Sequence, residues 1–461
     1  MQSNATNAVK SSNRKVFTIS SSVPAEPAPL TADTNISDDA ARWKTGLNFP
    51  NSRKTRNKQK DGESMYITEA AKQTEISDRC DVLVCGGGIA GISAALSAAR
   101  EGADVLLLER EWLLGGLATA GLVTVYLPLC DGLGRQVSFG IAEELLRLSV
   151  KHGAENGCDA WLGGSSAEER KKHRFRVQYN PNIFAIEVEK LLIENGARIL
   201  YGTSVCEVKT EENRITHVII ENKSGRSAIE FGCVVDATGD ADVCRLAGEN
   251  TELFRQGNIP AAWYYSLKDG KNCLNIIGAC DIPDSHKSAE QLEEAKKSVR
   301  FTGVDAKELS DITVMCHGKT LEHFLRHGDG TPEKSLTSIG IIPQVRMTRR
   351  LSGRYTMDDS EMHTQFSDSV GLFSDWRKAG PVYELPFGTL TGKTANLLAA
   401  GRCISVTEAM WDITRVIPVC AVSGQAAGTA AAICGDMTKP DISALQKKLA
   451  ENGVILHEAQ L

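Results

Sequence analysis

The sequence predicts an α/β fold with a parallel sheet, and three stretches of the chain support this prediction. Within residues 81–100, a short apolar strand leads directly into a G-x-G-x-x-G motif and an alanine-rich helix. A second apolar strand follows over residues 105–109, and a third, within residues 231–239, closes in Ala-Thr-Gly. Strands that alternate with helices in this way form βαβ units, whose strands are parallel.

Each glycine of the motif has its own physical role. Gly86 permits the tight turn after the strand, Gly88 lets backbone approach a pyrophosphate, and Gly91 lets the helix pack closely on the strand. The helix N-terminus offers N–H groups and a partial positive charge to phosphates. Glu109 ends the second strand, where a carboxylate accepts hydrogen bonds from ribose hydroxyls. The set predicts dinucleotide binding; the alternative is a glycine turn in an ordinary α/β domain.

Later stretches resemble a known family. A glycine doublet stands at residues 115–116, a strand within residues 396–402 ends in Gly-Arg, and a small-residue helix within 418–428 has proline in its first turn. Together with the arginine-rich residues 346–355, these stretches resemble the broad bacterial group of FAD-dependent oxidoreductases with a glutathione-reductase-like Rossmann fold. The resemblance covers residues 65–461. It implies an α/β architecture, a discontinuous Rossmann-type FAD-binding domain with an inserted α+β substrate domain.

The resemblance implies FAD as the cofactor. The helix that begins near Pro418 would direct its positive end at the pyrimidine side of the flavin, with Gly424 allowing close approach; helix packing is the alternative for this glycine. The familiar covalent-flavin histidine has no counterpart between Gly115 and Gly121, so we expect dissociable FAD. The candidate FAD-binding residues are Gly86, Gly88, Ile89, Ala90, Gly91, Glu109, Arg110, Gly115, Gly116, Val205, Ala237, Thr238, Gly239, Gly401, Arg402 and Gly424.

Arginines supply the candidates for substrate binding, because the planar guanidinium group binds carboxylates bidentately. Arg346, Arg349 and Arg350 would share one side if their stretch is helical, since their spacings are three and four. We take Arg346 and Arg350 as candidate catalytic residues. A structural ion-pair cluster is the alternative for each.

Two further catalytic candidates come from their positions. Arg415 lies just before the helix that should address the flavin, so we expect it to border the reacting centre. The alternative is that Arg415 pairs with Asp412 or Glu408 and only braces its loop. His363 is the candidate for proton transfer, with an ordinary loop histidine as the alternative.

Composition limits the partners that we expect. The chain has 461 residues and a net charge of −6, which argues against a nucleic-acid footprint. No apolar run reaches the roughly 18 residues of a membrane span, and the N-terminus lacks the apolar core of a signal peptide. We therefore expect a cytoplasmic protein that acts on a small molecule, with no membrane and no nucleic acid as partner; the oligomeric state is left open.

Metal and disulfide chemistry is not predicted. The thirteen cysteines are scattered and include no C-x2-C pair. Cys80 and Cys85 have the C-x4-C spacing of flavin-linked dithiols but flank the first strand, so packing is the better interpretation. His323 and His327 stand beside Glu322 as metal ligands would, although a polar helix face explains them equally well.

Patterning predicts the remaining elements and the domain limits. The tail before Met65 is rich in Ser, Asn, Thr, Pro and Lys, which predicts disorder, and we expect Met65 to be the natural start. Predicted elements are helices over 139–152 and 186–195, strands near 198–201, 204–209 and 216–220 with a turn at 211–214, a polar helical section over 288–327 and a helix over 443–452. Predicted segments are the tail 1–64, the FAD-binding domain in three parts (65–125, 181–250 and 386–440), an insertion 126–180, the substrate domain 251–385 and a C-terminal helix 441–461.

The leading function is that of an FAD-dependent oxidoreductase, which transfers a hydride or electrons between bound FAD and a small organic substrate that is oxygen-rich or anionic. A flavin monooxygenase is disfavoured because residues 399–402 read Ala-Ala-Gly-Arg and lack the Gly-Asp pattern of those enzymes. A disulfide reductase is disfavoured because a second nucleotide fingerprint and a well-placed dithiol are missing. The non-redox alternative is a flavoprotein, RNA-binding or otherwise, in which FAD is structural.

Overall fold

The computed structural model describes residues 67–461 with four gaps, at 153–165, 173–176, 279–282 and 328–329. The predicted tail 1–64 and the expected start at Met65 lie outside the described residues. Chain contacts divide the protein into two units, 1–45 and 46–461, and all described residues belong to the second unit.

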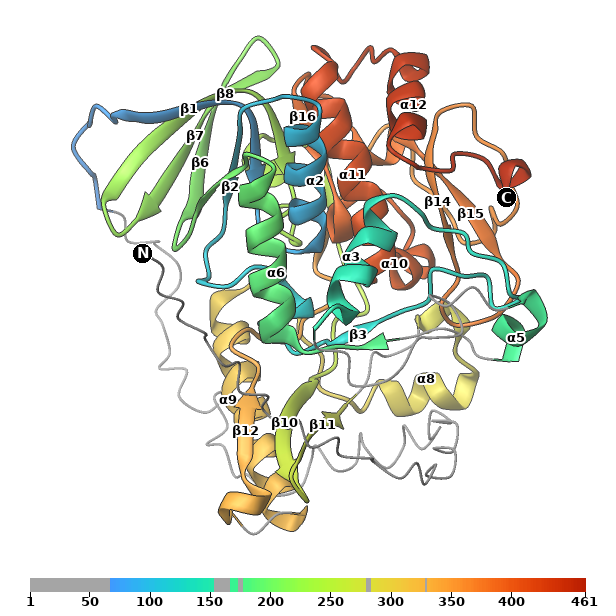
Figure 1. The fold of residues 1–461 in the computed structure, drawn as a ribbon. Coiled ribbons are helices and arrows are strands. Elements are labelled where there is room, and N and C mark those ends of the chain that lie inside the picture. The colour runs from blue at the N-terminus through green and yellow to red at the C-terminus, as the bar shows by residue number, and fades with distance from the viewer. Residues whose placement is uncertain (1–66, 153–165, 173–176, 279–282, 328–329) are drawn as a thin grey trace, which may run out of the picture. The chain divides into compact units, whose positions relative to one another are not determined.

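A seven-stranded sheet is the centre of the fold (Figure 1). Its order is β5-β2-β1-β8-β7-β6, and β16 also pairs with β8. Strands β5, β2, β1, β8 and β16 run parallel to one another. Strand β7 is antiparallel to both of its neighbours, β8 and β6. The strands are β1 (Ile76–Cys85), β2 (Val105–Leu108), β5 (Arg198–Leu200), β6 (Ser204–Glu211), β7 (Arg214–Asn222), β8 (Gly225–Asp236) and β16 (Leu397–Ala399). The α/β class with a Rossmann-type parallel sheet is thereby confirmed.

The parallel strands are apolar because both of their faces are covered. Every residue of β2 is buried, and Val84 of β1 pairs with Leu107 of β2 and Val235 of β8. At the β6–β7 connection, Glu212 and Asn213 adopt φ values of +43° and +66°, which confirms the turn predicted at 211–214.

Two small-residue helices, α2 (Ile89–Arg100) and α11 (Ile417–Ile433), lie side by side against the sheet (Figure 1). A Cβ atom at Gly424 would lie 2.3 Å from the carbonyl oxygen of Ala90, and one at Gly428 would lie 2.1 Å from that of Ala94. The helices therefore meet backbone to backbone, which only glycine allows. Further helices are α3 (Ile141–Val150), α5 (Ala167–Lys172), α6 (Pro181–Glu194), α7 (Asp242–Leu246), α10 (Glu408–Thr414) and α12 (Ile442–Glu451).

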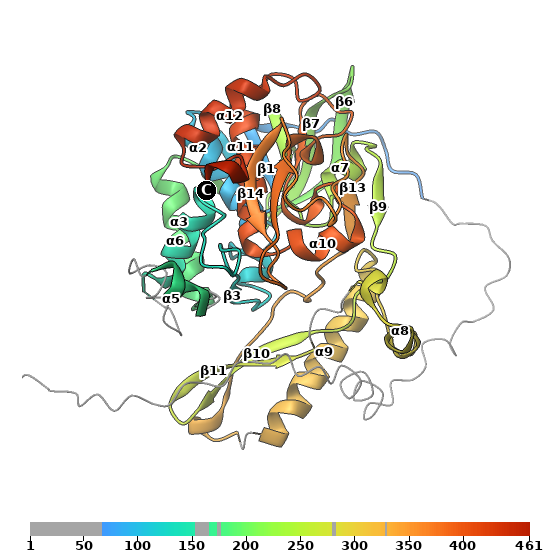
Figure 2. The ribbon, with the colours of Figure 1, turned by 90° about the vertical axis from the view of Figure 1, so that its right-hand side faces the viewer.

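The inserted region after residue 250 contains a small antiparallel sheet, with β10 between β11 and β12, and a long helix beside β10 (Figure 2). The helical section predicted over 288–327 consists of two helices, with a non-helical connection over 296–305. The elements are β10 (Ala262–Lys268), β11 (Lys271–Ile277), β12 (Leu336–Ile339), α8 (Ala289–Ala295) and α9 (Ala306–His327).

Short pairs of strands complete the described fold: β3 (Val125–Tyr126) with β4 (Val177–Gln178), β9 (Thr251–Leu253) with β13 (Arg349–Leu351), and β14 (Ser369–Ser374) with β15 (Val382–Pro386). Short 3-10 helices occur at Gly116–Ala118, Asp284–His286, Pro332–Lys334, Phe387–Leu390, Gly401–Cys403 and Glu458–Gln460.

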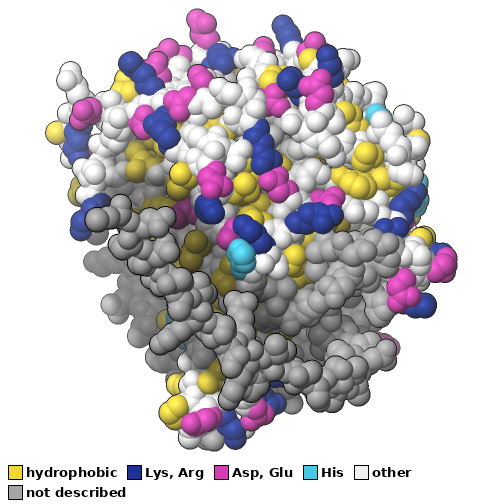
Figure 3. All heavy atoms as spheres, viewed as in Figure 1, with side chains coloured by type: hydrophobic (Ala, Val, Ile, Leu, Met, Phe, Trp, Pro, Cys, Tyr) yellow, Lys and Arg dark blue, Asp and Glu magenta, His cyan; other side chains and the backbone are white. Residues whose placement is uncertain are grey.

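The surface carries charges of both signs. On the face shown in Figure 3, basic and acidic side chains are interspersed over the described part. Among the described helices, no single one has the length and apolar composition of a membrane span; α10 and α11 pass that test only as a pair, and they are bent by 91°.

Candidate functional site

A cavity of about 450 Å³ lies at the carboxyl ends of β1, β2, β8 and β16. This is the edge at which open parallel sheets bind ligands, because the loops there are followed by helix N-termini. Fourteen of the candidate FAD-binding residues line it together: Gly86, Gly88, Ile89, Ala90, Glu109, Arg110, Gly115, Gly116, Val205, Ala237, Thr238, Gly239, Gly401 and Arg402.

The surroundings of Gly88 fit a phosphate-binding position. A Cβ atom at Gly86, where φ is +108°, would lie 2.4 Å from the carbonyl oxygen of Ala237, so the protein itself requires that glycine. A Cβ atom at Gly88 would meet no protein atom within 4 Å. Gly88 therefore leaves free space in the cavity wall at the N-terminus of α2, where a pyrophosphate group would be held.

The other two candidate glycines do not line the cavity. A Cβ atom at Gly91 would lie 1.8 Å from the carbonyl oxygen of Gly86, which reflects close packing of helix on strand. Gly424 contacts α2 in the same manner, at Ala90. We therefore correct both residues from cofactor contacts to packing positions. This agrees with the packing role described for Gly91 and with helix packing as the alternative for Gly424.

Glu109 places a carboxylate at the end of β2, inside the cavity wall. It is buried, and its Oε2 and Oε1 atoms accept hydrogen bonds from the backbone N–H groups of Gly87 (2.7 Å) and Glu111 (2.8 Å). Burial raises the pKa of Glu109, while these two hydrogen bonds and Arg110 act in the opposite direction. An ionised carboxylate retains further lone pairs, so it can still accept hydrogen bonds from ribose hydroxyls.

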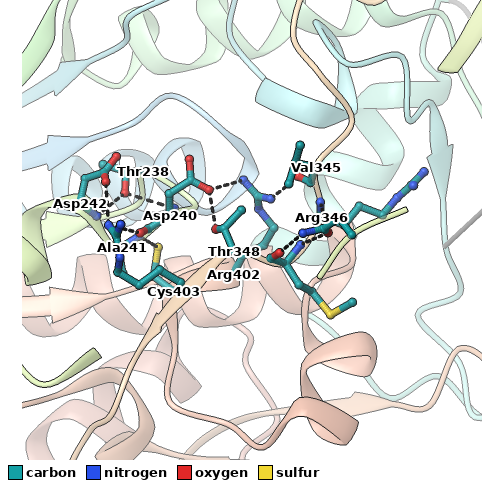
Figure 4. A network of polar contacts seen from close by, with 12 residues as sticks. Thr238, Asp240, Ala241, Asp242, Val345, Arg346, Thr348, Arg402 and Cys403 are labelled. Atoms are coloured by element: carbon teal, nitrogen blue, oxygen red, sulfur yellow. Dashed lines mark hydrogen bonds and ion pairs between the residues drawn. The ribbon is translucent and has the colours of Figure 1, made fainter. Parts of the chain in front are cut away.

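Arg402 connects the loop that follows β8, at Asp240, with the inserted region, at Val345 (Figure 4). Its Nη1 atom donates to the carbonyl oxygen of Val345 (2.6 Å), and its Nη2 atom lies 3.6 Å from Asp240. Asp240 also accepts a hydrogen bond from the Thr348 hydroxyl (2.6 Å). A side chain at Gly239 would collide with the Arg402 guanidinium group, since a Cβ atom there would lie 2.3 Å from Nη2.

Sequence reasoning missed the acidic pair Asp240 and Asp242, which also lines the cavity. Burial and the neighbouring carboxylates of Asp240 and Asp236 raise the pKa of Asp242 to about 6, against the opposing effect of Arg349 and Arg245. The signal that could have found the pair is the D-x-D that directly follows Ala-Thr-Gly.

Arg415 lines the cavity and also makes the ion pair foreseen as its alternative. Its Nη2 and Nε atoms lie 2.6 Å and 3.0 Å from Oδ1 of Asp412, and its guanidinium carbon lies 5.8 Å from the ring centre of Trp376. Glu408 instead accepts a hydrogen bond from the backbone N–H of Arg255 (2.8 Å). Pairing with Asp412 does not remove Arg415 from the cavity wall, so its catalytic role remains a prediction.

The arginine-rich stretch is not helical over residues 343–351, so the condition under which Arg346, Arg349 and Arg350 would share one side is not met. Arg346 precedes β13 and lines the cavity, whereas Arg349 donates to the carboxylate of Asp242 (3.1 Å). Successive side chains of a strand point to opposite faces. Arg350 accordingly contacts Glu252 (2.7 Å) away from the cavity.

Arg350 is corrected from a catalytic candidate to a buried structural residue. Its guanidinium carbon lies 5.6 Å from the ring centre of Trp411, and its Nε and Nη1 atoms have no hydrogen-bond partner. Burial lowers the pKa of Arg350, and Glu252 opposes that shift. The carboxylates of Glu252 and Glu408 and the aromatic face of Trp411 therefore balance the charge.

The histidine candidates lie elsewhere. His363 has a φ of +58°, and its Nδ1 atom lies 2.8 Å from a carboxylate oxygen of Glu458 near the C-terminus; it does not line the cavity, so it is corrected from a catalytic candidate to an exposed contact of Glu458. A hydrogen bond of 2.7 Å joins the Tyr264 hydroxyl to Nδ1 of His323, on the face of α9 that packs against β10. Among the described residues, no three His, Cys, Asp or Glu side chains form a group that could hold a metal ion.

Among the described residues, no two cysteines form a disulfide. Burial raises the pKa of the Cys80 thiol to about 12, and it raises that of Cys85 as well. Cys85 and Cys420 line the cavity as neutral, buried groups. This agrees with packing as the interpretation of Cys80 and Cys85.

Comparison with known proteins identifies the family. The model of the FAD dependent oxidoreductase family matches residues 81–297 and 274–449. The chain belongs to this family. FAD is the cofactor of the family, and the free space at Gly88, the N-terminus of α2 and the Glu109 carboxylate suit its pyrophosphate and ribose groups.

Curated relatives match parts of the chain. A thiamine thiazole synthase of Methanococcus aeolicus is 30% identical over 189 residues, which cover 38% of this chain and 60% of the relative. A probable electron transfer flavoprotein-quinone oxidoreductase of Escherichia coli is 31% identical over 150 residues, or 31% of this chain and 33% of the relative. The chain thus spans less than two thirds of the length of these relatives.

Solved structures give weaker likenesses. A geranylgeranyl bacteriochlorophyll reductase-like protein of Thermoplasma acidophilum has 14% identity and a TM-score of 0.43, with 82% of each chain covered. The p-nitrophenol 4-monooxygenase of Pseudomonas putida has 11% identity and a TM-score of 0.44, with 84% of this chain and 92% of that chain covered. The fold assignment rests on the order of strands in the central sheet.

Proposed function

We propose that this member of the FAD dependent oxidoreductase family transfers a hydride or electrons between bound FAD and a small organic substrate that is anionic or rich in oxygen. The observation that carries the proposal is a shared cavity. Arg346 and Arg415 line the same cavity as the glycine motif and Glu109. Guanidinium groups suit carboxylate and carbonyl oxygens, and they retain their charge in a partly dry site.

The protein groups would hold and orient the cofactor and the substrate, while the flavin supplies the redox chemistry when bound. Gly88 and the first turn of α2 would bind the pyrophosphate, and Glu109 would bind the ribose. At another part of the cavity wall, Val416 and Ile417 form the N-terminus of α11. A helix N-terminus favours negative charge nearby, so this end suits an anionic substrate or charge that develops on the reacting groups.

Within this proposal, Arg415 would orient an oxygen atom of the substrate beside that helix N-terminus. Asp412 binds its Nε and Nη2 atoms, and the Trp376 ring covers its face. A guanidinium group held in this way loses little conformational freedom when a ligand binds. The ion pair with Asp412 therefore supports a positioned catalytic arginine as well as a braced loop.

The test is an anaerobic screen of the FAD-loaded protein with small organic donors, which include 2-hydroxy acids, other carboxylates, alcohols and aldehydes. Bleaching of the flavin absorption band identifies a donor, and the reverse reaction is followed by mixing reduced protein with carbonyl or unsaturated acceptors. The proposal fails if neither half-reaction occurs with any anionic or oxygen-rich compound. Bleaching only by a nicotinamide donor, followed by oxygen-dependent hydroxylation, would indicate a monooxygenase, and a flavin that resists all donors would indicate a structural cofactor.

A further inference from the structure

We propose that Arg346, which packs against Trp263, forms a carboxylate subsite in the cavity wall, and that the substrate is a carboxylate with a hydrocarbon part that lies on the adjoining apolar wall. The proposal deepens the proposed function and rests on it, because it names the substrate class of the same cavity. It concerns binding, so it can be tested separately from the redox reaction.

The first argument is the geometry of the Arg346 guanidinium group. Arg346 is 6% exposed, lines the cavity, and has its guanidinium carbon 5.3 Å from the ring centre of Trp263. Stacking on an aromatic face covers one flat side of a guanidinium group and leaves its N–H donors at the edge. Edge-on donors are the ones that bind a carboxylate bidentately.

The second argument is that Arg346 is held in place from several directions. Asn258 accepts hydrogen bonds from the backbone N–H groups of Arg346 (3.2 Å) and Met347 (3.1 Å). The Gln344 side chain accepts from Nη2 of Arg346 (3.4 Å) and donates to the carbonyl oxygen of Gly121 (2.6 Å). Because the Arg346 side chain is already ordered, it loses little conformational entropy when a ligand binds.

The third argument is the composition of the wall beside Arg346. Ile342, Pro343 and Val345 from the same extended segment line the cavity, as does Leu309 from α9. Their side chains offer no hydrogen bond to a ligand, and contact with a hydrocarbon group is favourable because it removes apolar surface from water. A cation beside an apolar wall matches a molecule that carries a carboxylate at one end and carbon chain or ring at the other.

The test measures binding to the FAD-loaded protein by isothermal titration calorimetry. The probes are straight-chain carboxylates from acetate to octanoate and the primary amides of the same lengths. We expect each carboxylate to bind at least tenfold more tightly than its amide. We also expect affinity to rise by up to about fourfold for each added methylene group that the wall buries.

Variants separate the two parts of the subsite. Arg346→Met should remove the preference for carboxylate over amide, and Arg346→Lys should retain part of it, because lysine keeps the charge but loses the fork. Leu309→Ala should reduce the gain per methylene group and leave the carboxylate preference intact. Arg79→Met is the matched control, since Arg79 is exposed and pairs with Glu230 (2.6 Å) on the sheet. The flavin content of each variant is read from its absorption spectrum, so that lost cofactor is recognised.

The outcomes are distinct. Equal binding of carboxylates and amides, no binding across the series, or a carboxylate preference that survives Arg346→Met would overturn the subsite. Binding that depends on Arg346 supports it even if no member of the series reduces the flavin. Flavin reduction by neutral substrates with no dependence on Arg346 would uphold the oxidoreductase function and reject the subsite.

Discussion

Gly88 and Gly91 stand three residues apart in one motif, yet a side chain at each would meet different surroundings. At Gly91 the obstacle is the carbonyl oxygen of Gly86, whereas at Gly88 the space belongs to the cavity. Substitution of Gly88 therefore tests cofactor binding with little direct cost to the fold, and substitution of Gly91 tests packing.

Gly88→Val should abolish or greatly weaken FAD binding, because its side chain would occupy the space of the pyrophosphate. The apo-protein should keep its melting temperature within a few degrees. Fluorescence titration gives the affinity, and Gly435→Val is the control, since a Cβ atom at Gly435 also meets no protein atom but lies on the surface. Full FAD occupancy in Gly88→Val would reject the assignment of the motif.

Glu109→Ala should weaken FAD binding less than Gly88→Val does. It removes ribose hydrogen bonds to a charged group, worth roughly 1.5–3 kcal/mol, without filling the cavity. The same titration measures the effect, and Glu230→Ala serves as the control because Glu230 pairs with Arg79 and is not among the residues that line the cavity. An unchanged dissociation constant for Glu109→Ala would place the ribose elsewhere.

Arg415→Ala should keep normal FAD content and slow flavin reduction by about 10²–10³-fold once a substrate is known, the scale of a lost electrostatic contact to the transition state. Rapid-mixing measurements of the flavin band give the rate. Arg354→Ala is the matched control, since Arg354 donates to the carbonyl oxygen of Thr438 and lies outside the cavity wall. A parent rate in Arg415→Ala, or loss of FAD and stability, would leave only the bracing role.

Asp242 should make the stability of the apo-protein depend on pH. Its pKa rises from 3.8 to about 6 on folding, so its contribution to stability is fully present below pH 4 and is lost as pH rises through 6. The stability of Asp242→Asn does not fall in this way, so the variant should be more stable than the parent by about 1–2 kcal/mol at pH 7. This value is smaller than the full pKa shift implies, because the Asp242 side chain is 40% exposed and solvent screens its charge. Urea unfolding at pH 4 and pH 7 measures it; a difference independent of pH would contradict the assignment.

At the scale of elements, the contact between α2 and α11 depends on glycine. Gly428→Val should destabilise the protein by about 3 kcal/mol, since the new Cβ atom would lie 2.1 Å from the carbonyl oxygen of Ala94 and the two helices would have to separate. Chemical denaturation of the apo-protein measures the loss, again with Gly435→Val beside it. Parent stability would show that the two helices have room to part.

Elements specified by local signals were predictable, and elements specified by distant partners were not. Strand β1, helix α2 and strand β2 follow from apolar runs and glycines that stand next to each other in the chain. Between α8 and α9, by contrast, Phe301 exchanges two backbone hydrogen bonds with Asn258 (2.8 Å and 3.0 Å), which interrupts the expected helical section. The stretch that contains Arg350 becomes β13 because it pairs with β9, about a hundred residues earlier in the chain.

The residues of the candidate site show the same difference between local signals and distant partners. Residues of the glycine motifs were predictable because a phosphate-binding turn is a local device. The contacts of Arg346 with Trp263 and of Arg415 with Trp376 join separate segments, and no spacing in the sequence indicates them. The Arg415–Asp412 pair is the exception, since the two residues are only three apart in the sequence and were named as an alternative on one expected loop.

At the scale of the whole molecule, the assembled cavity indicates how FAD is held. No histidine lines it among the described residues, and the two cysteines in its wall are buried neutral thiols whose pKa values are raised. We expect acid precipitation of the loaded protein to leave all flavin in the supernatant, because reversible contacts alone retain it. Yellow colour that stays with the precipitate would show a covalent bond.

Arg402 has a consequence for the thermodynamics of the complete enzyme. One guanidinium group bonds the carbonyl oxygen of Val345, beside the proposed substrate wall, and faces Asp240, beside the nucleotide loop. A ligand that shifts the Val345 segment therefore also changes the balance of charge next to the cofactor. Linkage requires the effect to be mutual: whatever factor a substrate applies to the dissociation constant of FAD, FAD applies to that of the substrate. The two affinities are properties of one coupled equilibrium.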